Sequence, residues 1–201
     1  MMALLLLTVV LTTDKLELHR MMHGVHTGWL DAFFSVITHV ADGWVPTVIS
    51  VCMLIFGTYR SFVMMGGACA FSALMVQALK RMFTMDRPSM FKEQLGDMHW
   101  VEGVELHHHL SFPSGHATAA FSMCFAAAVL IRRKEWGWLL CAFACLLAFS
   151  RVYLSQHFME DILAGSATGT LVSMAVYNWL YESRFAQRPW LRARLVRQRN
   201  Q

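Results

Sequence analysis

The stretch from Ser150 to Asp161 holds three residues that could bind and transfer a charged group, namely Arg151, His157 and Asp161. If the chain is helical from His157 onward, Asp161 lies one turn further along on the same face and can reach the imidazole. An aspartate in that position fixes the tautomer of the ring and strengthens it as a base or nucleophile. A salt-bridged helix end at a membrane boundary explains these residues equally well when they are taken alone.

A second cluster lies at Lys80 and Arg87, just after an apolar segment. If that segment continues as a helix, the two residues are two turns apart on one face, about 10 Å along the axis. Their long cationic side chains can then converge on one anion. Pro88 disfavours helical backbone at Arg87, so we expect the helix to end there. A basic membrane boundary would also account for this cluster.

A third cluster is Pro113-Ser114-Gly115-His116, immediately before another apolar segment. The free N–H groups and the positive dipole end of a helix N-terminus attract anions. Gly115 allows an anion to approach the backbone, Ser114 adds a hydroxyl donor, and His116 can supply a proton. A plain N-cap, with Ser114 capping the helix and no ligand bound, is the alternative interpretation.

The elements that must position these clusters are helices in a membrane. Hydrophobic residues make up 56% of the 201-residue chain and charged residues 15%, against about 25% charged in a soluble domain. The mean hydropathy is +0.43. We find no linker and no internal repeat, so residues 1–201 are expected to form one membrane-embedded domain. The formal charge of +4 is concentrated at the C-terminus, which argues against nucleic acid as a partner.

The apolar segments predict an all-α, polytopic membrane protein with a six-helix bundle, or five helices if a short first segment does not cross. The segment 14–41 carries apolar residues at three- and four-residue steps and is predicted to be an amphipathic helix at the interface. Gly165 and Gly169 have a spacing that allows close helix packing. The predicted spans are Met1–Leu11 (shortened), Trp44–Tyr59, Phe62–Leu79, Ala117–Ile131, Trp136–Phe149 and Ile162–Tyr181.

The basic residues predict how the helices are oriented. The turn 132–135 and the tail after Tyr181 are rich in arginine and belong on the cytoplasmic side by the positive-inside rule. All three polar clusters then lie together on the opposite, non-cytoplasmic side. Three cations and a helix N-terminus form a site for a dense negative charge such as phosphate, and two histidines can act as nucleophile and acid.

The three clusters resemble the signature motifs of the type 2 phosphatidic acid phosphatase family, the membrane relatives of the vanadium haloperoxidases. They match in order and internal spacing, as Lys80-x6-Arg87-Pro88, Pro113-Ser114-Gly115-His116 and Ser150-Arg151-x5-His157-x3-Asp161. The resemblance implies a six-helix membrane fold and metal-independent hydrolysis of phosphate monoesters or diphosphates.

The resemblance also implies roles for individual residues. His157 would attack phosphorus and form a phosphohistidine, oriented by Asp161. His116 would protonate the leaving oxygen and then activate water. No cofactor and no metal ligand is expected in the site. The residues expected to hold the phosphoryl oxygens are Lys80, Arg87, Ser114, Gly115 and Arg151.

A lipid whose phosphate lies at the headgroup level is the expected substrate class, with undecaprenyl diphosphate, phosphatidylglycerol phosphate, phosphatidic acid and lipid A as candidates. The segments 89–111 and 14–41 are expected to set specificity through residues such as His99, Trp100 and His107–His109. We expect a multi-pass protein of the bacterial inner membrane with its site facing the periplasm. The oligomeric state is left open.

Three alternatives stay open at this point. The same site could transfer phosphate to a second lipid instead of water, or the fold could be a catalytically silent scaffold. A metal transporter is suggested by 15 methionines and by His107–His109, but methionines fill apolar cores by default. The five cysteines lie in apolar runs without C-x-x-C spacing and are interpreted as small core residues; they are Cys52, Cys69, Cys124, Cys141 and Cys145.

Overall fold

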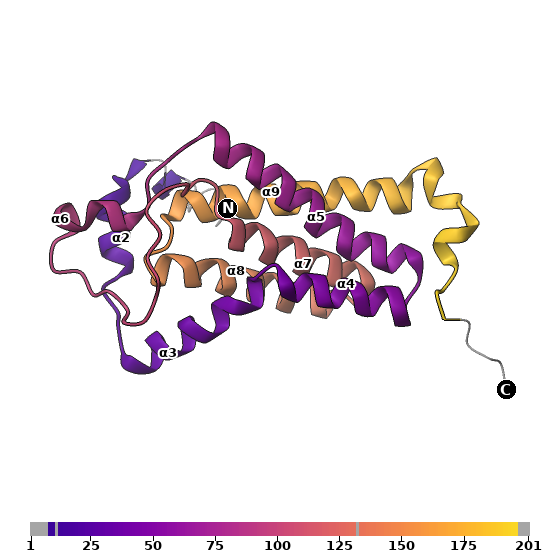
Figure 1. Ribbon diagram of the computed structural model, residues 1–201, viewed down its shortest axis with the longest axis horizontal. Coiled ribbons are helices and arrows are strands. Elements are labelled where there is room, and N and C mark those ends of the chain that lie inside the picture. Colours follow the sequence, from indigo (N-terminus) through magenta and orange to yellow (C-terminus); the bar gives the residue numbers. More distant parts are fainter. Residues whose placement is uncertain (1–7, 11, 132, 197–201) are drawn as a thin grey trace.

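The computed structural model describes residues 8–10, 12–131 and 133–196, and within them the regular elements are all helical. Figure 1 shows α4, α5, α7, α8 and α9 running along the long axis of the molecule, with α2 and α6 gathered at one end. The C-terminal residues lie at the other end. The α-helices are α2 (Lys15–Met22), α3 (Gly28–Ile37), α4 (Trp44–Phe56), α5 (Tyr59–Met82), α6 (Lys92–Leu95), α7 (Gly115–Ile131), α8 (Lys134–Tyr153) and α9 (Met159–Tyr177).

Shorter helical turns connect or extend these helices. They are η1 (Thr38–Ala41), η2 (Pro88–Phe91), the π-helical η3 (Asn178–Glu182), η4 (Arg184–Gln187) and η5 (Pro189–Arg192). The predicted spans Trp44–Tyr59, Phe62–Leu79, Ala117–Ile131 and Trp136–Phe149 correspond to α4, α5, α7 and α8 in that order. The last predicted span, Ile162–Tyr181, corresponds to α9 and η3. Each of α5, α7 and α8 extends beyond its apolar run into the neighbouring polar cluster, because apolar composition marks only the part of a helix that faces lipid or core.

The helices α5 and α8 are long and apolar enough to cross a membrane. A third crossing results if α3, η1 and α4, which bend by 46° at a short break, form one broken span, and α7 is a shorter apolar helix. Large apolar side chains point outward from these helices, including Phe56, Leu74 and Trp138 at 75%, 67% and 80% exposure. The predicted span Met1–Leu11 lies mostly outside the described residues.

Helix α7 lies at the centre of the bundle and packs against α5, α8 and α9. Small residues on α9 make the α7–α9 contact close: a Cβ added to Gly165 would lie 2.5 Å from the Ser114 carbonyl oxygen, and one added to Gly169 would lie 2.5 Å from that of Thr118. Both glycines therefore pack helices within the chain. Of the five free cysteines, Cys124 is buried, whereas Cys141 and Cys145 are exposed at the helix surface, so their assignment to the core was wrong.

The segment 14–41 is not one amphipathic helix as predicted, but α2, α3 and η1. Asp14 caps α2, accepting from the Leu16 and Glu17 amides at 2.9 and 3.1 Å. Thr27 adopts extended backbone and its hydroxyl accepts from the Leu30 amide, which starts α3 as a new helix. Two separate caps in one segment define two helices, and the chain between them is free to change direction.

Candidate active site

The three polar clusters meet at the end of the bundle that carries α2 and α6 (Figure 1). There the C-terminal ends of α5 and α8 lie beside the N-terminal ends of α7 and α9. The Ser114 amide donates to the Asp161 carbonyl at 3.0 Å, which joins the second cluster to the third. The Arg87 guanidinium donates to the Gln156 carbonyl at 3.1 Å, which joins the first cluster to the third.

His157 lies in the turn between α8 and α9, since α9 begins at Met159 and not at His157. Its ring nevertheless reaches Asp161 as expected, with Nδ1 3.3 Å from Oδ2. The same Nδ1 is 3.3 Å from the Ser111 hydroxyl, which in turn donates to Asp161 Oδ2 at 2.5 Å. Because the single hydroxyl proton of Ser111 is used on Asp161, both neighbours of Nδ1 are acceptors. The ring is therefore protonated at Nδ1, and Nε2 carries the lone pair.

The environment of His157 keeps its ring neutral. The residue is 1% exposed. Burial lowers the pKa of His157 well below its usual value, and the positive charges of Arg87, Arg151 and Lys80 lower it further. A neutral imidazole with a free Nε2 lone pair is the form that acts as a nucleophile.

Lys80 and Arg87 are buried cations, at 9% and 8% exposure. The Lys80 ammonium donates to the Leu110 carbonyl at 2.8 Å. The Arg87 Nε donates to the His109 carbonyl at 3.0 Å, and its Nη1 lies 3.1 Å from the Gln156 carbonyl. These partners are neutral oxygens, and within the described residues neither cation has a carboxylate within 4.0 Å.

Arg151 is the third buried cation, at 8% exposure. Its Nη1 donates to the Thr38 hydroxyl at 2.8 Å, and its Nε is buried without a partner. Three cations against the one buried carboxylate of Asp161 leave an excess of two positive charges. A buried charge without a counter-charge costs several kcal/mol, so a doubly charged anion would stabilise this cluster.

Arg87 reaches the site by a different route from the one predicted. The helix α5 ends at Met82, so Lys80 and Arg87 do not share a helical face. Arg87 is in extended backbone, and its amide donates to the His108 carbonyl at 2.8 Å while the Ser111 amide donates to the Met85 carbonyl at 2.8 Å. This pairing of two extended segments carries the chain away from the helix axis before Pro88 is reached.

His116 and Arg151 line a cavity of about 420 Å³ that also borders Thr38, Asp42 and Gln156. The His116 Nε2 lies 2.9 Å from the Asp42 carboxylate. As a carboxylate only accepts, Nε2 carries a proton and Nδ1 is left for proton exchange in the neutral ring. His116 therefore lies where a histidine can act as acid and base beside an anion-binding group.

Ser114 and Gly115 form the start of α7, as predicted. The Ser114 hydroxyl accepts from the Ala117 amide at 3.4 Å, so the capping interpretation holds for this side chain. A Cβ added to Gly115 would meet its nearest neighbour, Val76, only at 4.0 Å, so the backbone here is open to a ligand.

Four polar contacts of the site were not anticipated from the sequence. They are the hydrogen bonds that join His116 to Asp42, Asp161 to Ser111, Arg87 to Gln156 and Arg151 to Thr38. Ser111 and Gln156 stand next to motif residues and could have been found as their neighbours. Asp42 and Thr38 lie more than 70 residues from their partners and carry no spacing signal.

A family model described as the PAP2 superfamily matches residues 61–185, more than half of the chain and all of the candidate site residues. The chain belongs to the PAP2 superfamily. It is 29% identical over 182 residues to a lipid A 4'-phosphatase of Porphyromonas gingivalis, covering 86% of this chain and 74% of the relative. It is 27% identical over 170 residues to the undecaprenyl-diphosphatase BcrC of Bacillus subtilis, covering 82% of this chain and 81% of the relative.

Two solved PAP2-type structures have the same fold. The crystal structure of Aquifex aeolicus LpxE superposes with a TM-score of 0.71 at 24% identity, covering 82% of this chain and 94% of that one. A PAP2-type phosphatidylglycerolphosphate phosphatase from Bacillus subtilis superposes with a TM-score of 0.70 at 22% identity, covering 90% and 96%. The two superpositions show the fold, and membership of the PAP2 superfamily with its named phosphatase relatives makes this chain a membrane phosphatase of that family.

Proposed function

We propose that this PAP2 enzyme removes phosphate from a lipid phosphate or lipid diphosphate through a phosphohistidine on His157, without a metal ion in the reaction. The observation that carries the proposal is the environment of His157. Its Nδ1 proton is held by Asp161 and Ser111, its Nε2 lone pair is free, and three cations without carboxylate partners surround it. That combination is a neutral nucleophile inside a phosphate-binding pocket.

In the first half of the reaction, His157 Nε2 attacks phosphorus and a P–N bond forms as the bond to the lipid oxygen breaks. Asp161 stabilises the positive charge that develops on the ring through the Nδ1 proton. A protonated His116 donates its proton to the leaving oxygen. In the second half, neutral His116 takes a proton from water, the water oxygen attacks phosphorus, and the P–N bond breaks.

The phosphoryl oxygens would take the place of the neutral oxygens that now accept from the cations. Lys80 would exchange the Leu110 carbonyl for a phosphoryl oxygen, and Arg87 would exchange that of His109. The unpartnered Nε of Arg151 offers a further donor. Ser114 and the Gly115 N–H complete the cradle at the start of α7, where the helix dipole favours an anion.

The substrate class follows from the position of the site and from the relatives. The site lies at the end of the bundle opposite the basic residues that follow α9, and the positive-inside rule supports a position on the non-cytoplasmic face (Figure 1). We place the protein in a bacterial inner membrane with the site towards the periplasm. The relatives are named for lipid A and undecaprenyl diphosphate, and we propose a lipid of this kind as the substrate.

The test is phosphate release in detergent, in the presence of EDTA, from lipid A, undecaprenyl diphosphate, phosphatidylglycerol phosphate and phosphatidic acid. Enzyme that is denatured in alkaline SDS after reaction with labelled substrate should retain label that is stable to base and lost in acid, as a phosphoramidate is. His157→Ala should abolish both label and turnover. Wild-type turnover by His157→Ala would overturn the proposal.

His116→Ala separates the two histidines. It should form the adduct poorly from a lipid phosphate, whose alkoxide is a poor leaving group, but well from p-nitrophenyl phosphate, which needs no acid. Arg81→Gln is the matched control for the cations, because Arg81 is exposed and adjoins Lys80 in the sequence.

A further inference from the structure

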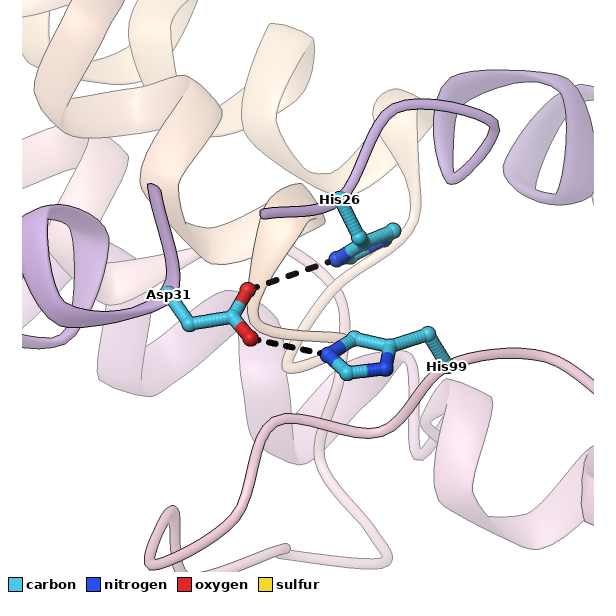
Figure 2. Close-up of side chains that lie close together, drawn as sticks. All are labelled: His26, Asp31 and His99. Carbon is cyan, nitrogen blue, oxygen red and sulfur yellow. Dashed lines mark hydrogen bonds and ion pairs between the residues drawn. The ribbon is translucent and has the colours of Figure 1, made fainter. Parts of the chain in front are cut away.

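A second cluster of chemically active side chains lies outside the phosphatase site, and Figure 2 shows its three members converging. His26 comes from the connection between α2 and α3, Asp31 from the first turn of α3, and His99 from the loop between α6 and α7. His26 Nδ1 is 3.5 Å from Asp31 Oδ1, and His99 Nε2 is 2.9 Å from Asp31 Oδ2. The three ligand atoms all lie within 4.8 Å of one another.

The hydrogen bonds of His23 fix the tautomer of His26. His23 Nε2 is 3.0 Å from the Val152 carbonyl, which can only accept, so His23 Nε2 carries the proton. In the neutral ring His23 Nδ1 is then an acceptor, and His26 Nε2, 2.8 Å away, must donate to it. A neutral His26 therefore turns a bare Nδ1 towards the Asp31 carboxylate. Two acceptors then lie 3.5 Å apart, an arrangement that a cation between them would stabilise.

That cation is either a second proton on His26 or a metal ion. The neutral ring is the form that a metal ion needs. The hydrogen bond from His26 to His23 is also the kind of outer contact that orients a metal-bound imidazole.

The donor set of the cluster suits zinc. Zinc binds imidazole nitrogen and carboxylate oxygen at about 2.0–2.1 Å in tetrahedral geometry, which puts neighbouring ligand atoms roughly 3.3 Å apart. His26 and His99 contact different oxygens of Asp31, at 3.5 and 2.9 Å, and one ligand atom from each residue can be chosen within 4.8 Å of the others, so small side-chain shifts bring the three atoms to that spacing. The Tyr153 hydroxyl donates to Asp31 Oδ1 at 2.6 Å and holds the carboxylate in place.

We propose that His26, Asp31 and His99 bind one Zn²⁺ ion, with water as the fourth ligand. A cavity of about 520 Å³, lined by His23, His26, His99 and their neighbours, gives the ion access from solvent. The site is separate from the phosphatase chemistry and needs no step of it.

The zinc site would fasten the loop between α6 and α7 to the connection between α2 and α3. His99 is the contact from the loop, its side chain is 46% exposed, and it is held by the hydrogen bond to Asp31 and by the His26 ring, whose centroid is 4.4 Å away. The cluster is also connected to the phosphatase site along the chain. Tyr153, which contacts Asp31, is two residues from Arg151. Ser155, whose hydroxyl lies 2.9 Å from His23 Nε2, is two residues from His157. The ion would therefore stiffen the covering of the phosphatase site from outside it.

The experiment is zinc titration of tag-free, EDTA-treated protein in detergent, followed by calorimetry and by the visible absorption of Co²⁺ as a substitute. One equivalent should bind with a tetrahedral cobalt spectrum, and saturating zinc should raise Tm. Asp31→Asn and His99→Ala should abolish the site. Tyr153→Phe, which removes only an outer contact, should weaken binding by about 10-fold, at the low end of the effect of such contacts.

The control is His109→Ala. His109 is an exposed histidine 2.7 Å from Asp86, so it forms a similar pair, with no third ligand among the residues that the structure describes. His109→Ala should leave zinc stoichiometry and affinity unchanged. The proposal is overturned if wild-type protein binds no zinc at micromolar concentrations, or if His99→Ala binds as well as wild type while His109→Ala does not. It is equally overturned if NMR finds His26 doubly protonated at pH 7 with zinc present.

Discussion

The Asp42 carboxylate lies 2.9 Å from Nε2 of His116, and so joins the turn before α4 to the first turn of α7. The same carboxylate accepts from His39 at 2.8 Å through its other oxygen. A carboxylate on one nitrogen of an imidazole stabilises the charged ring and fixes which nitrogen exchanges protons. His116 thus has an orienting partner just as His157 does.

Asp42→Asn keeps the shape of this contact and removes its charge. We expect kcat for a lipid phosphate to fall about 10-fold, part of the 10²–10⁴-fold that a positioned acid or base contributes. With p-nitrophenyl phosphate, which leaves without protonation, the loss in the first chemical step should be small. Burst kinetics with both substrates measure this difference, and equal losses of the burst rate would count against the role of Asp42.

Gly165→Ala tests the close contact between α9 and α7. The added methyl group would lie 2.5 Å from the Ser114 carbonyl oxygen, so the start of α7 must move. We expect a loss of stability of about 1–3 kcal/mol and a marked fall in kcat, because Ser114 belongs to the proposed phosphate cradle.

Two further glycines make the matched set for this experiment. Gly169→Ala meets backbone at the same 2.5 Å but one turn further from the site, so it should cost stability with a smaller effect on kcat. Gly137→Ala has nothing within 4 Å and should leave both unchanged. Thermal unfolding and phosphate release, measured on all three, separate packing from catalysis. Equal kcat in the Gly165 and Gly169 variants would contradict the special position of Ser114.

The pH dependence of the enzyme should respond to Arg87. Its positive charge is the strongest of the charges that lower the pKa of His157, after burial itself. Removing it in Arg87→Gln favours the protonated ring, so the pKa of His157 rises and the acid limb of kcat/KM moves to higher pH. The pH profile of kcat/KM is measured in detergent between pH 4 and 8. Arg81→Gln should leave both the activity and the acid limb of kcat/KM unchanged. An acid limb that does not move in Arg87→Gln would contradict the electrostatic argument.

His19 offers a test of stability. Both ring nitrogens of His19 are buried without a partner, and burial lowers its pKa to about 3, with His23 adding to the effect. Since the unfolded chain takes up a proton near pH 6.5 and the folded one does not, stability falls as pH drops from about 6.5 towards 3. His19→Leu should raise the stability at pH 7 by about 1 kcal/mol and flatten this fall. Tm measured from pH 7 to 4 gives both quantities, and His109→Leu, at an exposed position, should change neither.

The sequence was sufficient for the parts of the site that rest on local spacing. The His157–Asp161 contact, the Ser114 cap and the PAP2 motifs depend on residues a few positions apart, where helix geometry and capping rules apply directly. The helix cores were predictable for a similar reason, because lipid requires long apolar runs.

The parts that could not be predicted depend on contacts between distant segments. Arg87 was expected on the face of α5, but its backbone pairs with that of His108 and leaves the helix after Met82. The segment 14–41 was expected as an amphipathic helix from the apolar period between Leu30 and Val40, which lies in α3 and η1, whereas α2 before the cap at Thr27 has no such period. Asp42 is 74 residues from His116, and no periodicity or motif spacing in the sequence predicts their contact.

The two extended segments 85–87 and 108–111 are joined by backbone hydrogen bonds. The Arg87 amide donates to the His108 carbonyl, and the Ser111 amide donates to the Met85 carbonyl. A bond from the Ser89 hydroxyl to the His107 carbonyl, at 2.5 Å, closes the same ladder. The chain between Ser89 and His107 is thereby a loop with fixed ends, and loop length costs little free energy when the ends are fixed. A loop of another length or sequence could be grafted between them without moving Arg87 or Ser111. We therefore expect reaction and substrate choice to be separable in this enzyme, with the loop as the segment to exchange when a different lipid is wanted.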